Sequence, residues 1–189
     1  SYTDMAGRVD QVVYAAAAAP YPCQQSFFNP QGHLVKQIDP EGLITLYQYD
    51  ERGQLEFTAL DLNGNGRIDL AGPDRLIRTV TDVLAKDGLP VRRTRTYVYP
   101  EIGSDRSLLV GTLETSADGL KVWQTTGNGG AALTRQTETR YAAARGYRYL
   151  TQTAPDGSQE TSLYQFGQLQ SLTRTDSTGA LLGQTTCQY

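Results

Sequence analysis

The fold of this chain follows from one stretch of sequence, Tyr47-Gln48-Tyr49-Asp50-Glu51-Arg52-Gly53-Gln54-Leu55. Tyr47 and Tyr49 are two residues apart, so both side chains lie on the same face of a β-strand. The Asp-x-x-Gly segment that follows is typical of a turn, because Gly adopts positive φ and Asp accepts hydrogen bonds from its own backbone. Leu55 then begins the return strand on the buried side. The stretch predicts an antiparallel β-hairpin.

The same pattern occurs at two further places, one intact and one split between the ends of the sequence. Residues 23–34 carry the intact copy, CQQSFFNPQGHL. Residues 187–189 followed by residues 1–9 read CQYSYTDMAGRV and match it position for position. The motif glycines are 25 residues apart from Gly7 to Gly32 and 21 apart from Gly32 to Gly53, enough for two strands and two turns. The pattern therefore predicts a repeat protein, one unit of a longer array.

Strand and turn signals continue through the rest of the chain. Polar Thr and Gln alternate with Leu, Val and Tyr, which is typical of half-buried strands. The predicted strands include residues 43–49, 77–83, 94–99, 134–141 and 160–166, and Gly-containing turns are predicted at 39–42, 86–88, 117–119, 155–157 and 177–179. No stretch keeps a helical period over three turns. We therefore expect a long meander of antiparallel hairpins.

Residues 47–55 resemble the YD repeat of the Rhs and teneurin families, and the Pro-x-Gly turn at residues 40–42 precedes them as in those families. Residues 155–157 followed by 164–169 resemble a further copy with a shortened turn. The resemblance implies a spiralling β-sheet, which in family members forms a hollow shell around a toxin or a cell-surface stalk. It is strong over residues 1–60 and 150–189, and weaker between them.

These observations predict an all-β chain, a meander of antiparallel hairpins in a spiralling YD-repeat-like sheet with a calcium-type loop inserted. We expect residues 1–189 to form a single module. Within it the predicted parts are clear repeats over 1–60, the calcium-type loop over 61–75, diverged strands over 76–149 and repeats again over 150–189.

The inserted loop carries closely spaced oxygen ligands of the kind that Ca²⁺ prefers. Asp, Asn, Asn and Asp occupy positions 1, 3, 5 and 9, Gly66 occupies position 6, and a backbone carbonyl is available at position 7. Gly72 stands at position 12, where an EF-hand has a bidentate Glu, so Asp74 would have to replace that ligand. The predicted ligands are Asp61, Asn63, Asn65, Arg67 through its carbonyl, Asp69 and Asp74. The alternative is an Asn-Gly-rich turn without metal.

Cys23 and Cys187, the two cysteines, occupy the same position of the repeat. In an oxidising compartment they would form a disulfide between neighbouring subunits. Equivalent residues of successive hairpins in a flat sheet are roughly 9.5 Å apart, which exceeds disulfide reach and favours free thiols. Both alternatives stay open. The split repeat also predicts an assembly seam formed by Tyr2, Asp4, Gly7, Gln188 and Tyr189.

Composition and isolated residues offer little support for catalysis or nucleic-acid binding. The net charge is −3, so the chain lacks the excess of basic residues that is typical of a nucleic-acid binder. No apolar run is long enough to span a membrane. The single histidine, His33, follows a turn and is expected to be a solvated turn residue rather than a catalytic base. Trp123 and the tyrosines are expected in the core or in cross-strand ladders, with a glycan-binding platform as the alternative.

We therefore predict a non-enzymatic, extracellular or cell-surface structural protein that assembles head to tail, with itself or as part of a longer repeat chain, into a fibre or stalk. An open strand edge is costly to expose, and pairing between units would remove it. The first alternative is a fragment of an Rhs-type shell that encloses a toxin. The second is a carbohydrate-binding adhesin that uses exposed Tyr side chains and Trp123.

Overall fold

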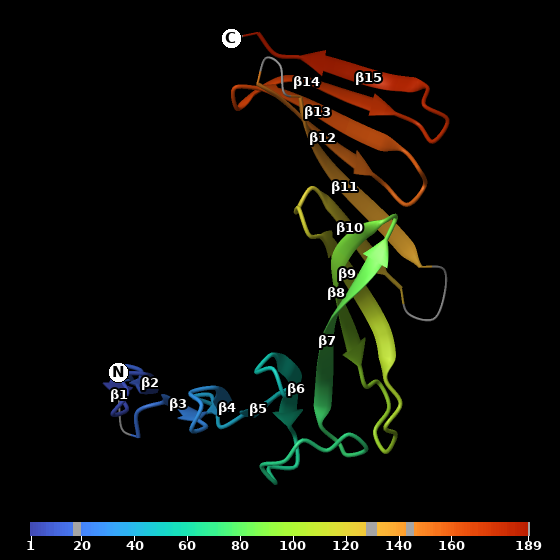
Figure 1. The fold of residues 1–189 in the computed structure, drawn as a ribbon. Coiled ribbons are helices and arrows are strands. Elements are labelled where there is room, and N and C mark those ends of the chain that lie inside the picture. Colours follow the sequence, from blue (N-terminus) through green and yellow to red (C-terminus); the bar gives the residue numbers. More distant parts are fainter. Residues whose placement is uncertain (17–19, 128–131, 143–145, 189) are drawn as a thin grey trace. The chain divides into compact units, whose positions relative to one another are not determined.

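The computed structural model is all-β and describes residues 1–16, 20–127, 132–142 and 146–188. No helix occurs among these residues, so none is available to cross a membrane. The strands are β1 Tyr2–Thr3, β2 Val9–Val13, β3 Cys23–Phe28, β4 Leu34–Ile38, β5 Ile44–Tyr49, β6 Leu55–Asp61, β7 Arg75–Lys86, β8 Leu89–Val98, β9 Leu108–Ser116, β10 Lys121–Thr126, β11 Leu133–Ala142, β12 Tyr147–Thr153, β13 Gln159–Gln165, β14 Gln168–Thr175 and β15 Leu181–Thr186 (Figure 1).

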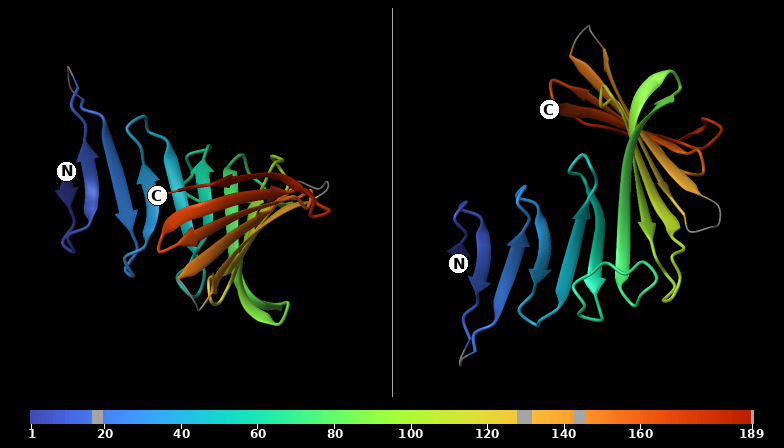
Figure 2. Two further views of the ribbon diagram at one scale, coloured as in Figure 1. Left: turned by 90° about the horizontal axis from the view of Figure 1, so that it is seen from above. Right: turned by 60° about the horizontal axis from the view of Figure 1, so that its bottom comes forward.

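Each strand pairs with its neighbours in the sequence, in the order β1 to β15, which confirms the predicted meander. The chain divides into two compact units, residues 1–80 with 96–108 and residues 81–95 with 109–189. Figure 2 shows β1 to β6 side by side in the first unit and β11 to β15 side by side in the second. The predicted arrangement of residues 1–189 as a single module stays a prediction.

Six hairpins of the meander close through the same five-residue turn, at residues 4–8, 29–33, 39–43, 50–54, 154–158 and 176–180. In each turn the N–H of position 1 donates to the carbonyl of position 5, and the N–H of position 4 donates to the carbonyl of position 1. Position 4 is Gly with positive φ in every case, between +75° and +88°. The Asp at position 1 of four turns, Asp4, Asp39, Asp50 and Asp176, also accepts from the N–H groups of positions 3 and 5. This confirms the predicted turn chemistry.

Four of these turns are followed by a β-bulge at the same distance along the chain. After the turn at 50–54, Tyr49 pairs with Leu55 and Gln48 pairs with Phe57, so Glu56 is the extra residue. The equivalent extra residues after the turns at 4–8, 29–33 and 176–180 are Asp10, Val35 and Leu182. The turns at 39–43 and 154–158 have no such bulge. The turn at 176–180 lies in the region 150–189 that the sequence predicts as repeats, and Thr175 precedes its Asp as Thr3 precedes Asp4.

The shortened repeat copy at residues 164–169 closes differently. Phe166 and Gly167 form a two-residue connection between β13 and β14, and both have positive φ, +48° and +85°. A positive φ at a bulky aromatic residue is unusual. The Phe166 ring lies over Gly146, where a Cβ would approach Cε1 of the ring to 2.8 Å.

The core of the first unit forms where three consecutive strands place small and large apolar residues opposite each other. Leu46 on β5 pairs with Ala59 on β6, and Ala59 pairs with Leu76 on β7. All three are buried, and Ile44, Ile68 and Tyr99 pack against them. Ile68 belongs to the inserted loop, so this loop covers one face of the sheet.

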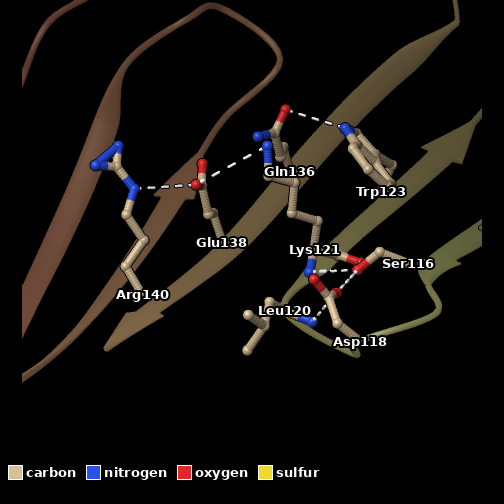
Figure 3. Close-up of polar contacts among 8 residues, drawn as sticks. All are labelled: Ser116, Asp118, Leu120, Lys121, Trp123, Gln136, Glu138 and Arg140. Carbon is tan, nitrogen blue, oxygen red and sulfur yellow. Dashed lines mark hydrogen bonds and ion pairs between the residues drawn. The ribbon is translucent and has the colours of Figure 1, made fainter. Parts of the chain in front are cut away.

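The second unit buries its single tryptophan, Trp123, and Figure 3 shows the Gln136 side chain pointing toward it. Trp123 on β10 is 5% exposed, and its indole N–H donates to Gln136 Oε1 on β11 at 3.0 Å. The Lys86 ammonium lies 4.4 Å from the ring centroid and pairs with Glu114. Trp123 is therefore a core residue, as expected, and gives no exposed surface for a glycan. The adhesin alternative, which also relies on exposed Tyr side chains, stays a prediction.

Candidate functional site

The inserted loop joins the end of β6 to the start of β7, between the strands that the sequence predicted as its flanks. Asp61 is the last residue of β6 and Asp74 directly precedes β7, and each is 6% exposed. The Asp61 carboxylate accepts hydrogen bonds from the N–H groups of Gly64 and Gly66 at 2.7 and 2.8 Å. The Asp74 carboxylate accepts from Leu62 N–H and Asp69 N–H, both at 3.1 Å. These two buried carboxylates therefore cap the backbone of the loop.

The exposed part of the loop is organised around Asp69. The side-chain amides of Asn63 and Asn65 both donate to Asp69 Oδ2, at 2.9 and 2.6 Å. These hydrogen bonds, that of Asn63 first, lower the pKa of Asp69 below its ordinary value. Arg67 joins this hydrogen-bond network through its backbone N–H, which donates to Asn65 Oδ1 at 2.8 Å. Gly72 is required beside Asp69, because a Cβ there would approach Asp69 Cβ to 2.5 Å.

The structure thus brings five of the six predicted metal ligands into one hydrogen-bonded loop, with Arg67 joined to it through its backbone N–H. Within the described ranges, no group of three or more His, Cys, Asp or Glu side chains is placed to hold a metal ion. The carboxylates of Asp61 and Asp74 point at backbone N–H groups. Calcium binding stays a prediction.

A second arrangement links the turns at 4–8, 29–33 and 50–54, which we call the ladder turns. They close the hairpins β1–β2, β3–β4 and β5–β6, so they lie at the same end of the antiparallel strands. The Arg8 guanidinium lies 4.5 Å from the centroid of the Phe28 ring, and the His33 ring stacks on the Tyr49 ring at a centroid distance of 4.5 Å. Side chains of one ladder turn therefore contact the next hairpin.

His33 and Tyr49 have roles that the sequence did not reveal. His33 is at position 5 of its turn, as expected, but it is half-buried because its ring stacks on Tyr49. The Tyr49 hydroxyl donates to the carbonyl of Leu34 on β4 at 3.0 Å. The sequence signal that could have found this contact is the aromatic residue before position 1 in successive copies.

The predicted seam and disulfide residues are distributed over both units. Tyr2 is exposed on β1, Asp4 and Gly7 belong to the first ladder turn, and Gln188 is exposed after β15. Tyr189 lies outside the described residues. Cys23 begins β3 and Cys187 directly follows β15; both are half-buried free thiols. The seam and the intersubunit disulfide stay predictions.

The last strand of the second unit, β15, is exposed along its whole length. All six of its residues are exposed, with Leu181 at 62% and Leu182 at 68%. It pairs with β14 on one side and has no described strand on the other. Its residues, 181–186, include neither a charged side chain nor a proline.

Comparison with known proteins identifies the repeat. Residues 28–67 match the family model described as RHS Repeat. The match contains the ladder turns at 29–33 and 50–54, the stacked pair His33 and Tyr49, and the first part of the inserted loop. No curated protein matches the chain. Residues 28–67 are therefore similar to the RHS repeat, as the resemblance of residues 47–55 to the YD repeat implied.

Proposed function

We propose that this RHS-repeat chain is a non-enzymatic structural β-module that assembles head to tail into an extracellular fibre or stalk. The observation that carries the proposal is the edge of β15, which no described strand covers. Natural sheets protect their edges with charges, prolines or a covering segment, because exposed N–H and C=O groups recruit other strands. The β15 edge has no charge and no proline, and its side chains are exposed. These features support pairing with a further strand.

A second copy of the chain supplies that strand in the proposed assembly. The first unit presents the short strand β1 at its outer side, paired only through Tyr2 and Thr3. A head-to-tail contact between β15 of one copy and the β1–β2 side of the next is heterologous, and it generates a filament when it does not close.

Electron microscopy of the purified protein tests this proposal. We expect filaments from the unmodified chain and their loss in Gln184→Lys, because a charge on an edge strand opposes strand addition. The matched control is Gln124→Lys, which places the same charge on an exposed residue of β10, a strand with neighbours on both sides. Monodisperse small particles from the unmodified chain at high concentration would contradict the proposal, as would filaments that Gln184→Lys leaves intact.

One observation favours the alternative of an Rhs-type shell fragment. The first unit has a groove of about 710 Å³ lined by apolar side chains, among them Leu60, Leu62, Leu70, Ile77 and Ile102. Ile102 and Ile77 are well exposed there. A groove that exposes apolar side chains suits contact with another polypeptide, as in a shell that encloses one. A precursor with many more repeats and an unrelated C-terminal domain would favour this alternative over the fibre.

We further propose that Ca²⁺ braces residues 61–74. The support is the spacing of the oxygen ligands in the sequence and the presence of Asp61, Asp69 and Asp74 in the same loop; to bind the ion, the carboxylates of Asp61 and Asp74 would have to turn away from the backbone N–H groups that they now accept from. With a dissociation constant of about 0.1–1 mM, typical of extracellular modules, 10 mM Ca²⁺ should raise the melting temperature by about 3–10 °C. The increase should vanish in Asp61→Asn and persist in Asp176→Asn, a turn variant outside the loop. Equal melting temperatures with Ca²⁺ and with chelator would contradict the brace.

The intersubunit disulfide is proposed as the covalent form of the same assembly. It predicts a ladder of oligomers on non-reducing gels that collapses to monomer with reductant. Cys23→Ser and Cys187→Ser should each remove the ladder. Monomer alone without reductant would rule out the bond while leaving non-covalent assembly to be judged by microscopy.

A further inference from the structure

We propose that the side chain at position 5 of a ladder turn fixes the position of the following hairpin. We call this set of contacts the interlock. Three features carry this inference: a position-5 side chain that extends to the next hairpin, an aromatic ring that receives it, and a glycine whose missing Cβ makes room for it. These contacts lie inside one chain, so they are independent of whether chains assemble into filaments.

The first contact of the interlock joins the turn at 4–8 to the hairpin closed by the turn at 29–33. Arg8 is held by its own turn, because its Nε and Nη2 contact Asp4 Oδ2 at 2.7 and 2.6 Å. This restraint leaves the guanidinium over the ring of Phe28, where a cation is attracted by the π-electrons. A Cβ on Gly32 would lie 3.2 Å from Arg8 Nη1, closer than ordinary contact.

The second contact joins the turn at 29–33 to the hairpin closed by the turn at 50–54. It uses different residue types at the same positions of the repeat. His33 replaces the arginine, and its ring stacks on Tyr49 with an interplanar angle of 26°. The Tyr49 hydroxyl returns a hydrogen bond to Leu34, the residue after His33. A Cβ on Gly53 would lie 3.1 Å from His33 Cε1. Ring and glycine together therefore form the seat for the position-5 side chain.

In three turns of the same internal geometry, the glycine at position 4 has no such neighbour. Gly42 has φ of +87°, close to that of Gly32, yet nothing lies within 4 Å of a Cβ built on it. The same is true of Gly7 and Gly179. Glycine at position 4 thus serves its positive φ in every turn, and Gly32 and Gly53 also give room to the position-5 side chains Arg8 and His33. A Cβ on Gly157 would likewise come within 3.1 Å of Ser177 Cβ, but Ser177 is at position 2 of its turn. The double role of Gly32 and Gly53 separates the interlock from ordinary turn chemistry.

Four variants in a double-mutant design test the interlock: Gly53→Ala and Gly42→Ala, each made in the unmodified chain and in His33→Ala. Both alanines carry the strain of a positive φ, so the difference between them isolates the contact with His33. In the unmodified chain we expect Gly53→Ala to lower the melting temperature by about 3 °C more than Gly42→Ala. In the His33→Ala background this difference should fall below about 1 °C, because the clashing ring is gone.

Amide hydrogen exchange over residues 44–61 supplies a second readout that does not depend on a complete melting curve. His33→Ala should accelerate exchange in the β5–β6 hairpin, whereas Leu43→Ala, a position-5 change at the turn without a seat, should leave it unchanged. An equal loss of stability for Gly53→Ala and Gly42→Ala in the unmodified chain would overturn the interlock. So would a difference that survives in His33→Ala.

Discussion

The turns at 39–43 and 50–54 lie at opposite ends of the same strand, β5, and have the same internal hydrogen bonds. In both, position 1 donates to the carbonyl of position 5, and the Asp side chain accepts from two backbone N–H groups. Their surroundings differ. Gly53 is covered by His33 and a bulge at Glu56 follows, whereas Gly42 is uncovered and no bulge follows. Hydrogen bonds inside the turn thus close the hairpin. Contacts with the preceding hairpin are what distinguish the turn at 50–54 from the turn at 39–43.

The largest expected effect comes from the strand that both turns share. Leu46→Ala on β5 should lower the free energy of unfolding of the first unit by about 2–4 kcal/mol, because it leaves a cavity beside Ala59 and Leu76. Urea denaturation monitored by circular dichroism measures the loss. Leu43→Ala, at an exposed residue of the turn at 39–43, is the control and should cost far less. Similar losses for both would show that the Leu46 cluster does not act as the core.

The second prediction tests whether the Asp hydrogen bonds inside the two turns contribute equally to the free energy of unfolding. Asp39→Ala and Asp50→Ala each remove a carboxylate that accepts two backbone N–H groups, and each should cost about 1–2 kcal/mol. Denaturant midpoints should agree between the two variants within the error of the measurement. A much larger loss for Asp50→Ala would mean that its carboxylate also takes part in the contact between hairpins.

A smaller effect separates the two tyrosines of the repeat. Tyr49→Phe removes the hydroxyl that donates to Leu34 and should cost about 0.5–1.5 kcal/mol. Tyr47→Phe should cost less, because the Tyr47 hydroxyl is 3.5 Å from its acceptor, Gln37 Oε1. Thermal melts of the two variants give the comparison. The reverse order would show that Tyr47, rather than Tyr49, joins the hairpins.

The smallest expected effect is on the stability of the protein at acidic pH. Hydrogen bonds from the Thr178 side chain, and then from Ala180 N–H, lower the pKa of Asp176 from its ordinary value of 3.8. A lowered folded-state pKa contributes stability above pH 3.8 that is lost as the pH falls through the folded pKa. Asp176→Asn should therefore flatten the pH dependence of stability on the acid side. An NMR titration of the Asp176 carboxyl that gave a pKa at or above 3.8 would contradict this.

The sequence predicted the parts of the fold that depend on local chemistry. Turn chemistry predicted turns at 39–42 and 177–179, and the structure closes them as 39–43 and 176–180, because the positive φ of glycine is a property of a single residue. Alternation likewise predicted β5 and β13 within a residue or two of their bounds. The family resemblance of residues 47–55 agreed with the matched range.

Contacts between elements were beyond what the sequence could predict. The seat of His33 depends on the spacing of two hairpins, and the burial of Trp123 depends on Lys86 reaching it from another strand. In the inserted loop the spacing of oxygens suggested metal ligands, yet Asp61 and Asp74 cap backbone N–H groups. A carboxylate can serve either partner, and its position in the sequence does not distinguish them.

The meander has a consequence for how the chain folds. Because every strand pairs with the strand next to it in the sequence, no pairing has to wait for a distant segment, and such local topologies fold quickly. Hairpins closed by the five-residue turns should form first. The pairing of β6 with β7 must close the loop between Asp61 and Arg75, the longest connection within the first 80 residues. We expect this closure to set the rate at which the first unit becomes stable.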